Sequence, residues 1–297
     1  MKTSFGTLAT GEQASLYTIS CGGITAGISD YGATLVKLLV PDSEGNVADV
    51  VLGYDDANGY RTANGACLGA TVGRNANRTK GAAFVLSNKT WSMGNNENGN
   101  NLHSGPDYYF QRMWKLVSHT DDAVVLSLHS PHGDQGFPGN ADIQVTYRLD
   151  ETGGLHIVYD AVADQDTVFN LTNHSYFNLA GQDQTGKAMD QILSIPGRFF
   201  NPDDAQNIPT GELRNVEGTP MDFRAPKAIG RDEFKFDVFA KEEPKKEAPK
   251  AEKVVVKEEP VLLKQEPAPV VEEVPNTESA EVNTAEAAVA EDRNEEV

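Results

Sequence analysis

The sequence predicts an all-β protein, built as an antiparallel sandwich or barrel. Several runs are rich in β-branched residues and alternate apolar with polar positions, which is the period of a half-buried strand. Clusters of Gly, Asn and Pro separate these runs, as at 93–101 and 133–140. No run shows a helical period with caps. Many short strands with frequent turns favour antiparallel sheets over a parallel α/β arrangement.

The expected strands follow one another from the N-terminus. The segment 24–41 alternates around a break at Tyr31 and Gly32. A turn cluster at 41–46 separates it from a further strand at 47–54. The later strands are expected at 123–130, 141–149 and 154–163.

The composition changes after Phe239, beyond which there is no aromatic residue, glycine or cysteine. Residues 241–297 contain six prolines, 16 acidic and 8 basic residues. Such a segment cannot bury enough apolar surface to offset its ordering entropy. We therefore expect a β-domain at 1–238 and a disordered acidic tail at 239–297. The tail's short apolar runs, VVV and VLL, are either part of a solvated linker or a docking point for an unknown protein partner.

Charge and cysteine content narrow the classes of partner and compartment. The formal net charge is −19, which disfavours nucleic acid because phosphates are repelled. A neutral ligand such as a sugar is unaffected. Cys21 and Cys67 are expected to be reduced thiols. The N-terminus lacks an apolar signal region and no window approaches 18 apolar residues, so we expect a cytoplasmic protein without a membrane span.

Two polar segments are candidates for ligand binding. GRNANRT (73–79) places Arg74 and Arg78 around two asparagines. Guanidinium forks and amides suit a polyol or an anion, although ordinary turn chemistry uses the same residues. NGNNLHSG (98–105) places His103 among Asn and Gly, either as a ligand contact or as a structural hydrogen-bonding residue.

Two further segments contain histidines. SPHGDQGFPG (130–139) is a tight turn for which we expect an architectural role. A metal site from His129, His132 and Asp134 lacks any fixed ligand spacing, so no metal is predicted. In FNLTNHSYFNLAG (169–181), His174 lies in an apolar, strand-like run. It is either a satisfied core histidine or a proton donor aimed into a pocket.

Together these segments resemble the galactose mutarotase (aldose 1-epimerase) family over residues 5–235. The motifs occur in the family's order; they are GR-x-ANR, NNLH-x-G, SP-x-GDQGFPG and TNHSYFNLAG, followed by IPTGEL and GTPMDFRAPKAIG. The resemblance implies a large antiparallel β-sandwich, the family's supersandwich, with a groove for a hexose. It also implies an isomerase of carbohydrate metabolism that acts on free aldoses, galactose and glucose first, and needs no cofactor or metal.

The resemblance assigns roles residue by residue. Interconverting α and β anomers requires a base that deprotonates the C1 hydroxyl and an acid that protonates the ring oxygen. His174 matches the family's general acid, and histidine suits that role because it carries a transferable proton near pH 7. His103 matches the second active-site histidine. Asn77 and Arg78 match the residues that bind sugar hydroxyls, together with both histidines.

The resemblance ends before the family's general base, a glutamate expected after residue 230. No counterpart is found, because the sequence passes directly into the acidic tail. We therefore expect a C-terminally incomplete sandwich with doubtful turnover, in which Asp134 or Glu97 are the nearest candidates to substitute for the base. The alternatives are a carbohydrate-binding module without catalysis and an interaction protein that works through its tail.

Overall fold

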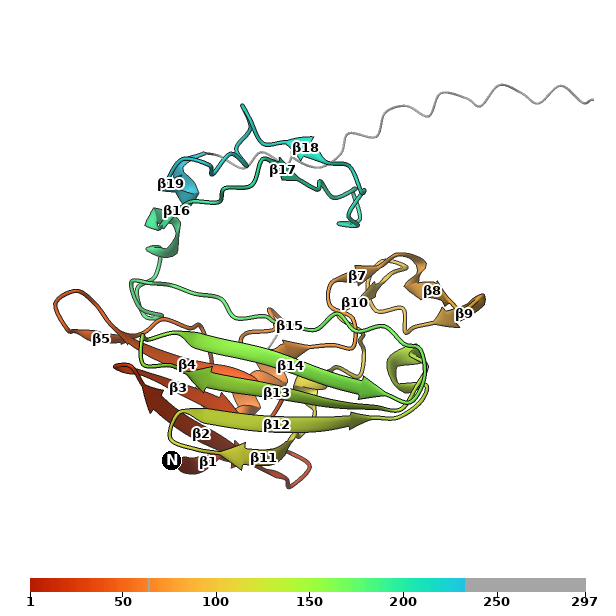
Figure 1. Ribbon diagram of the computed structural model, residues 1–297, viewed down its shortest axis with the longest axis horizontal. Helices are drawn as coiled ribbons and strands as arrows, with labels where there is room; N and C mark the ends of the chain where they lie inside the picture. The colour runs from red at the N-terminus through yellow and green to blue at the C-terminus, as the bar shows by residue number, and fades with distance from the viewer. Residues whose placement is uncertain (64, 233–297) are drawn as a thin grey trace, which may run out of the picture. The chain divides into compact units, whose positions relative to one another are not determined.

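The computed structural model describes residues 1–63 and 65–232 (Figure 1). The chain divides into two units, 1–244 and 245–297, and the described residues belong to the first. The predicted boundary at 238 and the predicted tail, 239–297, lie outside the described residues. Within the described part, antiparallel strands dominate, so the all-β class is confirmed.

The first sheet has five antiparallel strands in sequence order. They are β1 (Lys2–Thr7), β2 (Gln13–Cys21), β3 (Ile24–Ser29), β4 (Thr34–Pro41) and β5 (Val47–Asp49). The predicted break inside 24–41 is present, and Gly32 adopts a φ of 74° there. The strand predicted at 47–54 is shorter than expected. Its ladder stops at Asp49, whose carboxylate instead accepts the backbone N–H groups of Leu38 and Val51 at 3.0 and 3.2 Å.

The second sheet has four antiparallel strands and closely follows the prediction. They are β11 (Lys115–His119), β12 (Ala123–Ser130), β13 (Ala141–Leu149) and β14 (Leu155–Ala163). The predicted bounds of β12 and β13 are confirmed to the residue. Alternating burial along β13 places every second side chain in the interior, as the sequence pattern requires.

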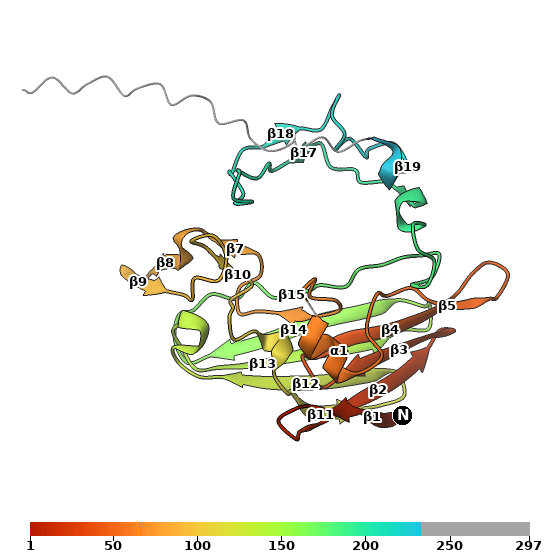
Figure 2. The ribbon, with the colours of Figure 1, turned by 180° about the vertical axis from the view of Figure 1, so that it is seen from behind.

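The two sheets lie face to face and share one apolar core (Figures 1 and 2). Ile19 and Ile28 of the first sheet belong to the same buried cluster as Ile143 and Val145 of the second. This is the packing of a β-sandwich. In the described residues β14 ends its sheet, and its inward side chains are only partly buried.

The remaining elements are short. One helix, α1 (Ala57–Ala63), packs on the first sheet through Ala57 and Tyr60 (Figure 2). It was not predicted, because seven residues are too few to show a helical period. The other strands are β6 (Thr71–Val72), β7 (Arg78–Thr79), β8 (Ala83–Leu86), β9 (Lys89–Ser92), β10 (Asn101–Leu102), β15 (Thr172–Asn173), β16 (Ile192–Leu193), β17 (Phe199–Phe200), β18 (Arg214–Asn215) and β19 (Lys227–Ala228). In the described residues no helix has the length and apolarity needed to cross a membrane.

One buried arginine ties the core to the loops at the end of the sandwich. The Arg74 side chain is fully buried and donates to five residues. The acceptors are the Tyr109 hydroxyl, the Ser130 carbonyl and hydroxyl, the Pro138 and Gly139 carbonyls and the Thr167 hydroxyl, at 2.6 to 3.4 Å. Its planar fork satisfies oxygens from three separate segments, which a lysine could not do.

The turn 130–139 has the architectural role predicted for it. The Gln135 side chain accepts the Arg74 backbone N–H at 3.0 Å and donates to the carbonyls of Gly73 and Asp107 at 3.1 and 2.9 Å. The backbone entering the segment 73–79 is therefore held from both sides. Both cysteines, Cys21 and Cys67, are unpaired, as predicted.

Replacement of Arg74 by Lys should destabilise the protein by roughly 3–5 kcal/mol, because several buried oxygens lose their donor. Urea unfolding followed by far-UV circular dichroism measures this change. The matched control is Arg148→Lys, since Arg148 lies on the exposed face of β13. Equal stability of the two variants would show that Arg74 does not hold the loops.

Candidate functional site

Three segments that are distant in sequence are joined by short ladders. β6 pairs with β15, with Thr71 opposite Asn173, and β7 pairs with β10, with Arg78 opposite Leu102. These two ladders fix the segments that carry Asn77, His103 and His174. The four residues predicted for the site are thereby brought together, while their roles stay predictions.

The backbone of the site is clamped by a serine. Buried Ser104 accepts the Asn75 N–H at 2.9 Å and donates to the Asn75 carbonyl at 2.8 Å. Asn77, His103 and Ser104 adopt left-handed φ values of 63°, 55° and 60°. Such conformations are costly for residues other than glycine and persist where surrounding contacts enforce them.

The two histidines face each other edge to face. The ring centroids of His103 and His174 lie 5.3 Å apart at 89°. His103 Nδ1 accepts the Asn77 backbone N–H at 3.0 Å. Because an N–H can only donate, neutral His103 carries its proton on Nε2, which makes that atom a hydrogen-bond donor.

The surroundings keep His103 neutral at physiological pH. Burial, followed by the His174 ring, lowers the pKa of His103 to about 4. The Arg78 guanidinium acts in the same direction, and Glu97 only partly opposes it. A neutral imidazole here donates a hydrogen bond without carrying charge.

The His174 imidazole is available to a ligand. Its backbone N–H donates to the Ala70 carbonyl at 2.9 Å, which fixes the chain. The ring centroid lies 5.2 Å from that of Tyr176. Among residues 1–63 and 65–232, neither ring nitrogen of His174 has a hydrogen-bond partner, as a group that exchanges a proton with substrate requires.

Arg78 is oriented by an acidic partner. Its Nε and one terminal nitrogen donate to the two oxygens of Glu97 at 2.6 and 2.7 Å. This bidentate pair lowers the pKa of Glu97 and raises that of Arg78. The Arg78 backbone N–H donates to the Asn77 side-chain oxygen at 2.9 Å, and this bond fixes the orientation of the Asn77 amide.

Some sequence-based interpretations change. For Arg74 the sequence left ligand binding and turn chemistry open, and the structure places this side chain in the core with its donors used. Asp134, a candidate substitute base, accepts two bonds from Arg112 at 2.8 Å and one from Ser130 at 2.5 Å. Burial raises the pKa of Asp134, but these hydrogen bonds outweigh it and the net pKa is lowered.

The residues considered for a metal have other partners. His129 Nδ1 lies 2.7 Å from Asp142, and His132 Nδ1 accepts the Gly139 N–H at 3.1 Å. In the described part of the chain no three His, Cys, Asp or Glu side chains gather in a way that could hold a metal ion.

Two neighbours of the site were missed by sequence reasoning. Glu97 was considered only as a base, and its pairing with Arg78, 19 positions earlier, has no sequence signal. Tyr176 lies two residues after His174 in the recognised motif, so its place beside the ring could have been inferred.

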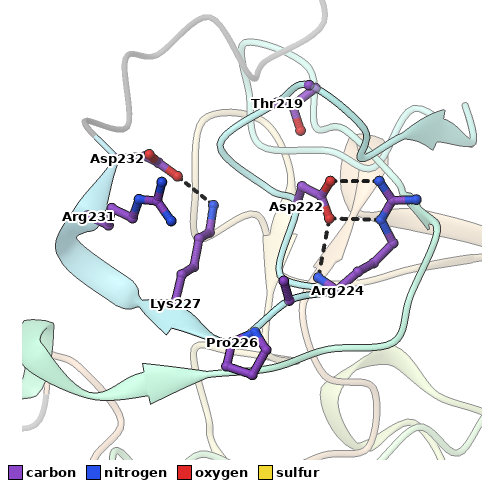
Figure 3. A pocket seen from close by; sticks show the side chains of 9 residues that line it. Thr219, Asp222, Arg224, Pro226, Lys227, Arg231 and Asp232 are labelled. Atoms are coloured by element: carbon purple, nitrogen blue, oxygen red, sulfur yellow. Dashed lines mark hydrogen bonds and ion pairs between the residues drawn. The ribbon is translucent and has the colours of Figure 1, made fainter.

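A cavity of about 560 Å³ lies elsewhere, in the segment 218–232 (Figure 3). Asp222 forms a bidentate pair with Arg224, and Lys227 pairs with Asp232 at 2.5 Å. None of the four predicted site residues lines this cavity. Two of the cations that line it are therefore paired with carboxylates.

Comparison with known proteins decides the family. The sequence model of the aldose 1-epimerase family matches residues 15–271. The chain belongs to the aldose 1-epimerase family. The family match runs past the domain boundary predicted at 238.

Named relatives agree with the family. The chain is 36% identical over 207 residues to an aldose 1-epimerase of Escherichia coli, covering 70% of this chain and 59% of that protein. It is 39% identical over 213 residues to a galactose mutarotase of Bos taurus, covering 71% and 60%. The chain thus spans less than two thirds of the length of these relatives.

Solved structures of the family have the same fold. An aldose epimerase homologue from C. elegans is 34% identical with a TM-score of 0.69, over 73% of this chain and 66% of that one. A galactose 1-epimerase from Lactobacillus acidophilus is 28% identical with a TM-score of 0.68, over 77% and 67%. The predicted family and fold are therefore confirmed.

The lowered pKa of His103 should be visible directly. We expect His103 to titrate near pH 4 in long-range ¹H–¹⁵N spectra of the imidazoles, with the Nε2–H tautomer at pH 7. Because the folded pKa lies below the ordinary value of 6.5, the unfolded chain binds this proton first as pH falls. The free energy of unfolding that depends on neutral His103 is therefore fully present above about pH 6.5 and is lost as the pH falls towards 4.

The variant Arg78→Gln provides the comparison, since removing this cation should raise the His103 midpoint. A wild-type midpoint near 6.5, unchanged in Arg78→Gln, would contradict the electrostatic interpretation.

Proposed function

We propose that this chain binds free aldohexoses, galactose and glucose first, and interconverts their α and β anomers slowly by acid–base ring opening. The observation that carries the proposal is the edge-to-face pair of His103 and His174 beside Asn77. The backbone beside the two rings is fixed by the hydrogen bonds of Ser104 to Asn75 and of His103 to Asn77. The names of the relatives, aldose 1-epimerase and galactose mutarotase, support the substrate class.

The proposed chemistry opens and recloses the hemiacetal. The ring oxygen gains a proton as the bond between C1 and that oxygen breaks, and the C1 hydroxyl loses its proton to give an aldehyde. Rotation about the C1–C2 bond then presents the other carbonyl face to the C5 hydroxyl, and closure inverts the anomeric centre. No electrons are gained or lost overall. Only proton transfers need catalysis.

Each residue has a proposed part. His174 delivers the proton to the ring oxygen, because its nitrogens are available in the described structure. His103 donates from Nε2 to the same region as a neutral group and stabilises the developing charge. The Asn77 side-chain NH₂ group binds ring hydroxyls, since only its oxygen is used by the Arg78 backbone. Arg78 binds them with the guanidinium N–H groups that do not donate to Glu97.

The base is the weak part of this machinery. Asp134 is bound by Arg112 and Ser130, and both oxygens of Glu97 are bound by Arg78. Neither carboxylate offers an uncommitted oxygen to a C1 hydroxyl. We therefore propose that water acts as the base, which makes turnover slow.

A carbohydrate-binding module without catalysis is the second candidate. The pairing of both candidate bases, Glu97 and Asp134, with arginines favours it. The two functions differ in one measurable quantity. A binding module retains sugar affinity but leaves the anomer equilibration rate at the buffer value.

Polarimetry of fresh α-D-galactose should show a protein-dependent rate about 10²–10⁴-fold below that of the Escherichia coli aldose 1-epimerase assayed alongside, because the two candidate bases, Glu97 and Asp134, are bound to arginines. His174→Ala should reduce this small rate only modestly at saturating sugar, because an acid contributes most when its partner base is also present. A rate matching the comparator and abolished in His174→Ala would show that a working base exists.

Sugar binding by calorimetry separates the two candidates. Galactose affinity should fall at least about tenfold in His174→Ala, because a partly buried hydrogen-bonding group is lost. His129→Ala is the control, because His129 is exposed and pairs with Asp142 away from the site. Equal affinity in both variants would place sugar binding elsewhere.

The Glu97–Arg78 pair should set sugar affinity through geometry. Glu97→Gln should weaken galactose binding about three- to tenfold, because an amide cannot hold the guanidinium at two acceptors. The measurement is calorimetric, with Glu44→Gln in the exposed turn 41–46 as control. Unchanged affinity in Glu97→Gln would mean that Arg78 is oriented without its carboxylate.

A further inference from the structure

A second cavity, of about 530 Å³, contains a partly exposed tryptophan. It lies between the hairpin β8–β9 (Figure 1), the turn 130–139 and the residues that follow β14. None of its lining residues belongs to the histidine site. The motif that supplies His132 was assigned only an architectural role, so this face of the turn has no function in the proposed reaction.

Trp91 forms an aromatic wall of the cavity. It lies on β9 opposite Phe84 of β8, so the hairpin ladder fixes its backbone. The His132 ring lies 5.7 Å from the indole in an edge-to-face arrangement, at 75°. The Lys89 ammonium lies 3.9 Å from the centre of the indole ring.

A hydrogen-bond donor and a hydrogen-bond acceptor both line the cavity that contains the indole. His132 Nδ1 accepts the Gly139 N–H at 3.1 Å, so its neutral form carries the proton on Nε2. The Gln165 amide, at 2.8 Å from the same Nδ1, therefore donates to it. In the described residues no hydrogen-bond acceptor is bound to His132 Nε2, which remains a donor.

An acceptor is supplied by the carboxylate of Asp166. One oxygen accepts the Ser87 hydroxyl at 3.2 Å, which links the hairpin to the segment after β14. Within the part of the chain that the structure describes, the other oxygen has no hydrogen-bond partner. The cavity thus offers an aromatic face, a neutral donor and a charged acceptor.

We propose that this cavity is a second carbohydrate site that binds one pyranose ring of a glycoside. The apolar C–H face of the sugar stacks on Trp91, His132 Nε2 donates to one hydroxyl and Asp166 accepts from another. Trp combines a large apolar face with little conformational freedom, which suits a polyol that has one apolar side. The Asp166 carboxylate disfavours phosphate and other anions.

The sugar takes the place of the Lys89 ammonium over the ring. An exposed cation–π contact of this kind is weak, so little is lost when the flexible side chain moves aside. The site is open and has few polar partners, which corresponds to a dissociation constant of about 1 mM. The ligand need not have a free anomeric carbon, because nothing at this site acts on C1.

Tryptophan fluorescence tests the proposal. The chain has two tryptophans, and Trp114 is only 3% exposed, so Trp91 is the reporter for an added ligand. The probe is methyl β-D-galactopyranoside, which cannot undergo mutarotation. The expected result is a saturable change in emission that persists in Trp114→Phe and in His174→Ala.

Polar variants leave the reporter in place. His132→Ala and Asp166→Ala should each weaken binding at least about fivefold, the equivalent of one hydrogen bond. Asp121→Ala, on an exposed turn, is the matched control. Circular dichroism shows whether each variant is folded.

The outcomes are distinct. A saturable change that is lost in His132→Ala and Asp166→Ala but kept in His174→Ala supports a second site. No saturable change, or one that neither polar variant alters, overturns the proposal. A change lost in His174→Ala assigns the glycoside to the histidine site and also overturns it, while the proposed ring-opening activity is tested separately by polarimetry.

Discussion

The buried guanidinium of Arg74 is the interaction on which the ligand-binding end of the sandwich depends. It satisfies oxygens from the turn 130–139, from Tyr109 and from the segment after β14. The same residue's backbone is held by Gln135 and leads directly into Asn75, Asn77 and Arg78. An apolar core alone would leave these loops without order, because their carbonyls have few other donors. The buried Arg74 guanidinium therefore holds these loops in a fixed position against the sheets.

The site combines two electrostatic situations. His103 is kept neutral by burial and by neighbouring imidazole and guanidinium groups, whereas Arg78 is held by a carboxylate. Neutral His103 can donate a hydrogen bond without carrying charge. The Arg78 guanidinium keeps its positive charge and is held in one orientation by Glu97. The two carboxylates considered as substitute bases are bound to cations, Glu97 to Arg78 and Asp134 to Arg112. The residues proposed as acid and sugar binders are thus held in place by their neighbours, whereas no base is proposed among these two carboxylates.

The sheets could be predicted from sequence where one face is buried. β12 and β13 alternate strictly, so their bounds follow from the pattern. The helix α1 could not be predicted in this way, because it depends on a capping bond from the Gly59 N–H to the Asp56 side chain. The early end of β5 could not be predicted either, because the Asp49 side chain replaces a ladder bond there. His103 and His174 were found through ordered motifs. The pairing of Glu97 with Arg78 was not, since Glu97 lies in a run of asparagines without periodicity. The role of Arg74 stayed open, because burial of a guanidinium has no local sequence signature.

The clamp between Ser104 and Asn75 has a consequence for the thermodynamics of ligand binding. Asn77, His103 and Ser104 adopt left-handed backbone conformations that hydrogen bonds within the protein hold in place. The conformational entropy of this loop is therefore lost during folding rather than during association. Calorimetric binding entropies for sugars should then reflect water release and sugar ordering rather than loop ordering, and association should proceed without a slow conformational step.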